Sequence, residues 1–212
     1  MHHAPTLHKY TSKIIDLVFG KPRSVPLANN FVSERSRSVD PEPFTLLSRL
    51  REKLDDSLDQ TDITAECVDH MVAGIETTGD ALCFLMWELS QPGSAHFQRE
   101  LRAELAENPD ASVDKLSLLD AVVQEGLRCF PAIPMSLPRV VPEGGRVIDG
   151  IPVPGGTVVS SQAYSVHRHN TTVYPEPDRF NPHRWMASTG DAERKRHMFA
   201  FSHGGRGCVG KQ

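Results

Sequence analysis

Apolar side chains recur every three or four residues over several stretches of the chain, and this spacing predicts amphipathic helices. The longest such stretch covers residues 62–91. Further helices are predicted over 92–107 and over 116–129, where a following proline ends the pattern. Weaker helical patterns cover residues 9–20 and 41–54. The first two thirds of the chain is therefore expected to be helical.

The pattern changes after Phe130, because frequent prolines exclude any long helix. Short β-prone segments lie at 137–141, 145–153 and 156–164, and they predict hairpins with turns at Gly144–Gly145 and Gly155–Gly156. Helices followed by short strands indicate an α+β fold that is mainly α with small β hairpins.

Composition and charge narrow the function classes. The 212 residues carry a net charge of −4, which argues against a nucleic-acid-binding surface. No apolar run is long enough for a membrane span, and the first residues do not resemble a signal peptide. The four cysteines form no C-x-x-C pair, which favours a reducing compartment. Three of them lie in apolar helical patterns and are expected to be buried: Cys67, Cys83 and Cys129.

The fourth cysteine lies in a different setting, in the motif Phe201-x-x-Gly204-x-Arg206-x-Cys208-x-Gly210. This motif resembles the cysteine loop of the cytochrome P-450 family, the haem-thiolate monooxygenases. The resemblance implies that the Cys208 thiolate is the proximal ligand of the iron of haem b. Gly204 would let the backbone approach the porphyrin, Arg206 would pair with a haem propionate, and Phe201 would shield the sulfur from water.

A second motif, AGIETTGD, lies in the middle of the long predicted helix. It resembles the oxygen-activation motif of the same family. The resemblance implies that Ala73 and Gly74 lie against the haem, and that Glu76 and Thr77 are catalytic and relay protons to the oxygen site. On its own, a Gly and a Thr pair in a helix is more often just a bend.

A third motif is the pair Glu125-x-x-Arg128, whose side chains share one helix face. The chain holds five Glu-x-x-Arg pairs, but this one ends an apolar helix and is followed by proline. In the family, such a pair joins an arginine from a PERF-like loop in a buried triad, and here the third member would be Arg184. His183 and Trp185, which depart from the usual loop residues, are not expected to touch the triad.

Two further sites leave alternatives open. Arg139 lies on a predicted strand, where family members often have an arginine that reaches a haem propionate; otherwise it is an exposed strand arginine. His167 and His169 would share a face if their segment were a strand, which allows a non-haem metal pair. An unrelated helical metal-binding module using these histidines and Cys208 is therefore a third hypothesis.

The motifs come in the family's order, which divides the chain into a segment of uncertain structure, 1–40, and a partial P-450 domain, 41–212. This domain would comprise the long central helix 62–91, the E-x-x-R helix 116–129, a β-rich segment 135–165, the PERF-like loop 175–186 and the cysteine loop 201–210. The sequence of residues 125–150 is most similar to that of fungal microsomal members of the family. Since relatives are about twice as long, we expect only the C-terminal portion of the fold, incomplete at both ends.

The resemblance implies insertion of one oxygen atom from O₂ into a lipophilic organic substrate, in fungal secondary or xenobiotic metabolism. Electrons would come from NADPH through a reductase. The residues nearest the substrate would be Ala73, Thr77 and 131–137. Family members lie at the cytosolic face of the endoplasmic reticulum, whereas this chain, lacking an anchor, would be cytoplasmic. The alternative is a catalytically inactive, truncated haem-binding fragment or pseudo-enzyme.

Overall fold

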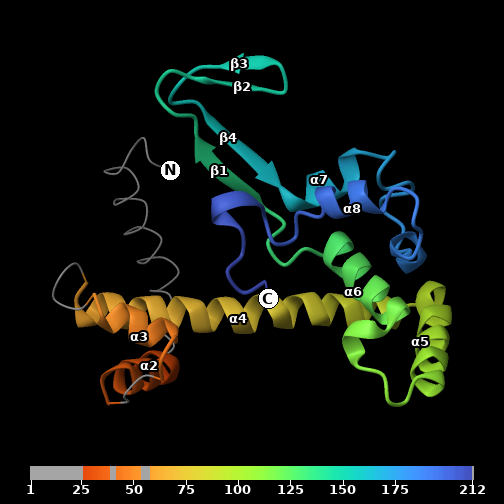
Figure 1. Ribbon diagram of the computed structural model, residues 1–212, viewed down its shortest axis with the longest axis horizontal. Coiled ribbons are helices and arrows are strands. Elements are labelled where there is room, and N and C mark those ends of the chain that lie inside the picture. The colour runs from red at the N-terminus through yellow and green to blue at the C-terminus, as the bar shows by residue number, and fades with distance from the viewer. Residues whose placement is uncertain (1–25, 39–41, 54–57, 212) are drawn as a thin grey trace, which may run out of the picture. The chain divides into compact units, whose positions relative to one another are not determined.

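The computed structural model describes residues 26–38, 42–53 and 58–211. The chain divides into two compact units, residues 1–73 and 74–212. The division falls inside the long helix α4, Gln60–Leu89, which corresponds to the helix predicted at 62–91 (Figure 1). The helix predicted at 9–20 lies outside the described residues.

The first unit holds two shorter helices, α2 (Pro26–Ser38) and α3 (Leu46–Arg51). Helix α3 is shorter than the pattern over 41–54 predicted. It begins late because the Thr45 side chain accepts a hydrogen bond from Ser48 N at 3.2 Å and so caps the first turn. Val32 of α2 and Ile63 of α4 are both buried in this unit.

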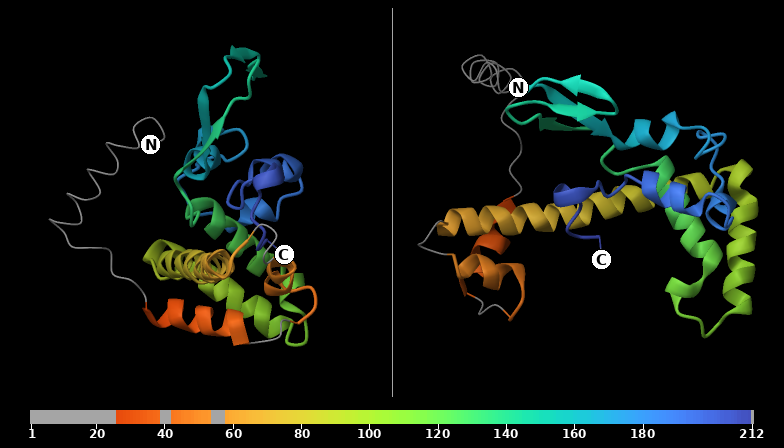
Figure 2. Two further views of the ribbon diagram at one scale, coloured as in Figure 1. Left: turned by 90° about the vertical axis from the view of Figure 1, so that its left-hand side faces the viewer. Right: turned by 45° about the horizontal axis from the view of Figure 1, so that its top comes forward.

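The helical part of the second unit comprises the end of α4 with α5 (Ala95–Glu107) and α6 (Ser117–Cys129), which Figure 2 shows together. A short 3₁₀ turn, Pro92–Ser94, precedes α5, and another, Val113–Lys115, precedes α6. Gly126 allows α6 to approach α4, because a Cβ there would lie 2.9 Å from Leu85 Cδ1. The buried core cluster consists of Leu85, Leu89, Phe97, Leu118, Val122, Cys129 and Phe180.

Two antiparallel strand pairs follow. Strand β1 (Ser136–Val140) pairs with β4 (Val158–Gln162), and β2 (Arg146–Ile148) pairs with β3 (Ile151–Val153). In Figure 1, the pair β2–β3 lies beyond the ends of β1 and β4 that point away from α7 (Ala163–His169). The tight hairpin turn lies at Asp149–Gly150, where both residues have positive φ, of 49° and 77°.

The predicted hairpin turns at Gly144–Gly145 and Gly155–Gly156 were wrong in one respect. Both segments do turn, but each carries the chain between the two strand pairs rather than between partners of one pair. Gly145 N donates to Pro142 O at 3.0 Å, and Gly156 N donates to Val141 O at 2.9 Å. The two glycine pairs therefore shape the corner at which one strand pair gives way to the other.

After β4 the chain returns to short helical segments. Helix α7 (Ala163–His169) occupies the end of the segment predicted as a strand. A 3₁₀ turn at Pro182–Trp185, helix α8 (Asp191–His197) and a 3₁₀ turn at Gly204–Arg206 complete the unit. The predicted fold class, mainly α with small antiparallel strand pairs, is confirmed. Within the described residues, no helix combines the length and apolar character needed to span a membrane.

Candidate functional site

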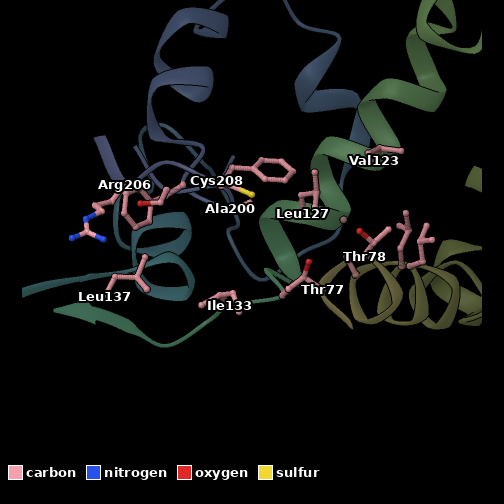
Figure 3. A pocket seen from close by; sticks show the side chains of 17 residues that line it. Thr77, Thr78, Val123, Leu127, Ile133, Leu137, Ala200, Arg206 and Cys208 are labelled. Atoms are coloured by element: carbon pink, nitrogen blue, oxygen red, sulfur yellow. The ribbon is translucent and has the colours of Figure 1, made fainter. Parts of the chain in front are cut away.

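The second unit contains an apolar cavity of about 400 Å³ between α4, α6 and the loop that carries Cys208 (Figure 3). In Figure 3, Thr77 and Thr78 face the cavity from α4, and Val123 and Leu127 face it from α6. Most of the lining is apolar, so the cavity suits a largely hydrophobic molecule. The remaining lining residues include Ala132, Ile133, Leu137, Phe199, Ala200, Phe201, Ser202, Arg206 and Cys208.

The loop that presents Cys208 is held by its own backbone. Cys208 N donates to Phe201 O at 2.8 Å, and Gly207 N donates to Gly204 O at 2.9 Å. Gly204 has a φ of +70°, a conformation that disfavours any residue with a Cβ. These bonds close a compact turn that leaves the Cys208 side chain exposed toward the cavity.

The donor chemistry of this loop fits haem. The described residues contain no group of three or more His, Cys, Asp or Glu side chains that could hold a bare metal ion. Cys208 can thus offer one sulfur to a metal that brings its remaining ligands with it, as haem iron does. A Cβ on Gly204 or Gly205 would meet no protein atom within 4 Å, so the loop leaves open space at these two positions.

The structure brings only part of the predicted helix motif to this cavity. Thr77 lines it, whereas Glu76 is exposed on α4 and is not among the lining residues. A Cβ on Gly74 would meet no atom within 4 Å. Ala73 is the last residue of the first compact unit and is exposed.

The two predicted propionate partners lie in different hollows. Arg206 lines the apolar cavity beside Cys208, and in Figure 3 its guanidinium extends away from the sulfur. Arg139 lines an adjoining hollow along the strand pairs, together with Ser160 and His203. It is exposed, and its Nη1 donates to Pro138 O at 2.7 Å.

Glu125, Arg128 and Arg184 come together on the side of α6 that faces the segment 175–185. Arg128 binds the carboxylate in bidentate fashion, with Nε 2.8 Å from Glu125 Oε2 and Nη2 2.9 Å from Oε1. Arg184 Nε donates to Oε1 at 3.1 Å. Glu125 and Arg128 are fully buried, at 0% exposure. A buried ion cluster of this kind needs close contacts between opposite charges, and here the single carboxylate contacts both guanidinium groups.

Sequence reasoning missed two further donors to the same carboxylate. Trp185 Nε1 donates to Glu125 Oε2 at 2.9 Å, so the expectation that Trp185 does not touch the triad was wrong. Asn181 N donates to Oε1 at 2.8 Å. His183, by contrast, pairs with Glu100 at 2.9 Å. The indole was missed because a tryptophan in a proline-rich loop is equally typical of simple apolar anchoring.

The donors around Glu125 set its charge state. Burial by itself would raise the pKa of Glu125, but the hydrogen bonds and charge of Arg128, followed by the charge of Arg184, lower it overall. The pKa of Arg128 is raised, because its contact with Glu125 outweighs the burial that would lower it. Burial also raises the pKa of the neighbouring Cys129 thiol to about 12, so this thiol stays protonated.

The interpretation of His167 and His169 as a metal pair on a strand was wrong. Both residues lie on α7, where positions i and i+2 point in different directions. His169 is exposed, whereas His167 is 0% exposed and uses both ring nitrogens in hydrogen bonds to backbone groups. Burial lowers the pKa of His167 to about 4, and the charges of Arg128 and Arg168 add to this effect. The hydrogen bond to the backbone oxygen of Arg128 is the main effect in the opposite direction, followed by the charge of Glu125.

This low pKa of His167 predicts acid sensitivity in a defined window. Between pH 6.5 and about 4 the unfolded chain binds a proton at this histidine that the folded chain does not. The free energy of unfolding should therefore fall by about 3 kcal/mol as the pH drops through this window. Glu125 adds a further loss only below pH 4.5, since its pKa in the folded chain is lowered.

Urea unfolding between pH 7 and 4 measures this loss. A His167→Gln variant should show a flatter dependence of the free energy of unfolding on pH over the same window. His169→Gln changes an exposed histidine of the same helix and should keep the slope of the unsubstituted chain. Equal slopes in all three proteins would contradict the assignment of the acid sensitivity to His167.

The expectation of three buried cysteines holds only for Cys129. Cys67 is partly exposed and Cys83 is exposed. Cys83 lies on α4 between the exposed Leu82 and Phe84, on turns of the helix where only Leu85 and Leu89 are buried. Helical spacing alone cannot tell which of several apolar faces a neighbouring element covers.

Comparison with known proteins agrees with this site. The family model Cytochrome P450 matches residues 23–212. The chain is 30% identical over 203 residues to the cytochrome P450 monooxygenase stcB of Emericella nidulans, and 35% identical over 205 residues to the cytochrome P450 monooxygenase hkm5 of Aspergillus hancockii. These alignments cover 92% and 91% of this chain, respectively, and 38% of each relative. The chain thus spans well under half the length of these relatives. With a family match over nearly its whole length and a cysteine loop that faces an apolar cavity, this chain belongs to the cytochrome P450 family.

Proposed function

We propose that the chain binds haem b through the Cys208 thiolate and forms the catalytic part of a haem-thiolate monooxygenase. The observation that carries this proposal is the shared cavity: Cys208 lies on one wall and Thr77 on another, with mostly apolar side chains between them. A haem would need apolar contacts over its ring and one donor atom from the protein, and the apolar lining and Cys208 would supply them.

The bound haem would supply the binding and activation of O₂, in which a thiolate ligand favours O–O cleavage. Cys208 would hold the haem by its sulfur, and Phe201, which lines the same cavity, would shield that sulfur from water. Arg206 offers a guanidinium to a propionate from the cavity wall, and Arg139 offers one from the adjoining hollow. Gly204, with its φ of +70°, would let the loop turn close to the ring.

Proton delivery is assigned to α4. The Thr77 hydroxyl lines the cavity and can hold and pass a proton at its oxygen. Glu76 is exposed and next to Thr77 in sequence, so it can exchange protons with solvent. Glu125, Arg128 and Arg184 do not line the cavity and serve as the scaffold that holds α6 against the segment 175–185.

The substrate class follows from the lining of the cavity. Ala132, Ile133 and Leu137 present apolar side chains, which favours a lipophilic organic molecule. Electrons would come from NADPH through a reductase at the cytosolic face of the endoplasmic reticulum. A role in fungal secondary or xenobiotic metabolism is proposed from the fungal relatives.

A haem-binding protein without turnover is the second candidate. The position of Glu76 favours it, because this acid does not reach the cavity that Thr77 lines. Such a protein would bind haem through Cys208 but would transfer protons to the oxygen site slowly.

Reconstitution of the 212-residue chain separates these candidates. The chain is supplied with haem, reduced and exposed to CO, and we expect the red-shifted Soret band of thiolate-ligated haem. NADPH, a reductase and a panel of lipophilic substrates are then added, and oxygenated product is measured. Product supports the monooxygenase, whereas a thiolate band without product supports the second candidate. No haem uptake contradicts both.

A further inference from the structure

The buried imidazole of His167 lies between the Glu125–Arg128 pair and the segment that leads to Cys208. His167 Nδ1 is 2.9 Å from Arg128 O, and His167 Nε2 is 2.8 Å from Phe199 N. A backbone N–H can only donate, so Nε2 is the acceptor and Nδ1 carries the proton. The ring thus connects two backbone groups that are 71 positions apart in the sequence.

On the α6 side, the contact is reciprocal. Arg128 Nη1 donates to the backbone oxygen of His167 at 3.3 Å while the ring donates to the backbone oxygen of Arg128. Arg128 lies in the last turn of α6, where backbone carbonyls have no partner within the helix. Arg168 satisfies the next carbonyl, that of Cys129, at 3.0 Å. Helix α7 therefore caps the end of α6 with two neighbouring side chains.

On the other side, Phe199 begins the segment that forms the cavity wall. Phe199, Ala200 and Phe201 all line the cavity. Phe199 O accepts from Ser202 N at 3.0 Å, and Phe201 O accepts from Cys208 N at 2.8 Å. A chain of hydrogen bonds and short covalent links thus runs from the buried Glu125 through His167 to the backbone of Cys208.

We propose that His167 is a positioning residue that holds the segment Phe199–Phe201, and with it the Cys208 loop, at a set distance from α6. The T-shaped contact with Tyr174, with ring centroids 6.4 Å apart, keeps the imidazole plane in place. The inference deepens the proposed function, because it concerns the orientation of the proposed haem ligand. The hydrogen bonds that carry it exist in the protein without haem, so they can be tested separately.

The first test needs no haem. In the ¹⁵N spectrum of the histidine-labelled chain, His167 should be the Nδ1-protonated tautomer at pH 7. The backbone amide of Phe199 should exchange roughly tenfold faster in His167→Phe, because its buried acceptor is lost. His167→Gln, which keeps both a donor and an acceptor, should restore most of the protection. His169→Phe alters an exposed residue of the same helix and should leave the exchange unchanged.

The second test uses haem and CO. His167→Phe should bind haem but show at least a fivefold smaller ratio of the thiolate-type Soret band to the band of haem without a thiolate ligand. His167→Gln should restore this ratio. If His167→Phe does not fold, His167→Asn takes its place, since the shorter amide cannot reach both partners. The Nε2-protonated tautomer, or unchanged Phe199 exchange in the folded variant, overturns the proposal. If the unsubstituted chain binds no haem, the proposed function fails while the exchange experiment still decides the role of His167.

Discussion

Replacement of Cys208 by serine is expected to abolish the thiolate-type Soret band of the reduced CO complex and any monooxygenation. A serine hydroxyl stays protonated near neutral pH and is a poor donor to iron, whereas a thiolate binds iron and pushes electron density onto it. No other cysteine among the described residues lines the cavity, so no neighbouring sulfur can replace it. The loss should be complete rather than graded.

Cys83→Ser is the matched control, because Cys83 is exposed on α4 within the same compact unit. This variant should keep the haem content, the Soret band and the turnover of the unsubstituted chain. Circular dichroism should show unchanged helix content in both variants, because Cys208 is exposed and its backbone bonds do not involve the sulfur. A thiolate-type band that survives in Cys208→Ser would show that another cysteine is the ligand.

Glu125→Gln is expected to lower the free energy of unfolding by about 3–5 kcal/mol, or to prevent folding. The substitution keeps the size of the side chain but removes the one negative charge that contacts both guanidinium groups, which are buried or nearly buried. Each carboxylate oxygen of Glu125 now accepts hydrogen bonds from N–H donors. In the variant, the amide NH₂ would take the place of one oxygen and would face those donors without being able to accept from them. Arg128, at 0% exposure, would be left as a buried cation without its partner.

Glu176→Gln is the control for this prediction, because Glu176 and Arg179 form a Glu-x-x-Arg pair with the same spacing. Their side chains are 70% and 68% exposed, and the two groups are 3.4 Å apart. Exposed pairs contribute less than about 1 kcal/mol, so this variant should unfold close to the unsubstituted chain. Urea unfolding of the haem-free proteins at pH 7 compares the two. A loss of under about 1 kcal/mol for Glu125→Gln would contradict a structural role of the triad.

The helices that could be predicted well are those whose pattern is local. The long apolar pattern corresponds to α4 at Gln60–Leu89, and the pattern over 116–129 corresponds to α6 at Ser117–Cys129. Both segments keep one apolar period over more than three turns, so the sum of many weak preferences outweighs any single exception. Short segments lack this averaging, which is why α7 was missed at the end of a β-prone run and α8 was not predicted at all.

Some residues of the candidate site could likewise be predicted from the sequence, and others could not. Cys208, Arg206 and Phe201 could be proposed as site residues because they lie within eight residues of one another in one motif. Glu125 and Arg128 could be chosen among five similar pairs because of the apolar helix around them. The contact of Arg184 with Glu125 spans 59 positions and was expected only because the family resemblance implied it. The contacts of the Trp185 indole with Glu125 and of the His167 imidazole with Phe199 also join distant residues, but no motif indicated them.

The sequence by itself was enough to predict the family and the order of the motifs, and to propose which residues carry the chemistry. These predictions rest on residues that are close together in the sequence, such as the cysteine among glycines or the Glu-x-x-Arg pair on one helix face. They therefore do not depend on how distant parts of the chain pack. Only the tertiary structure decided which motif residues share a cavity. It placed Thr77 but not Glu76 on the wall, gave Glu125 five hydrogen-bond contacts from four residues and made His167 the link between α6 and Phe199. The physical reason is that burial and hydrogen-bond partners depend on which elements pack together, and that packing is settled by the whole chain at once.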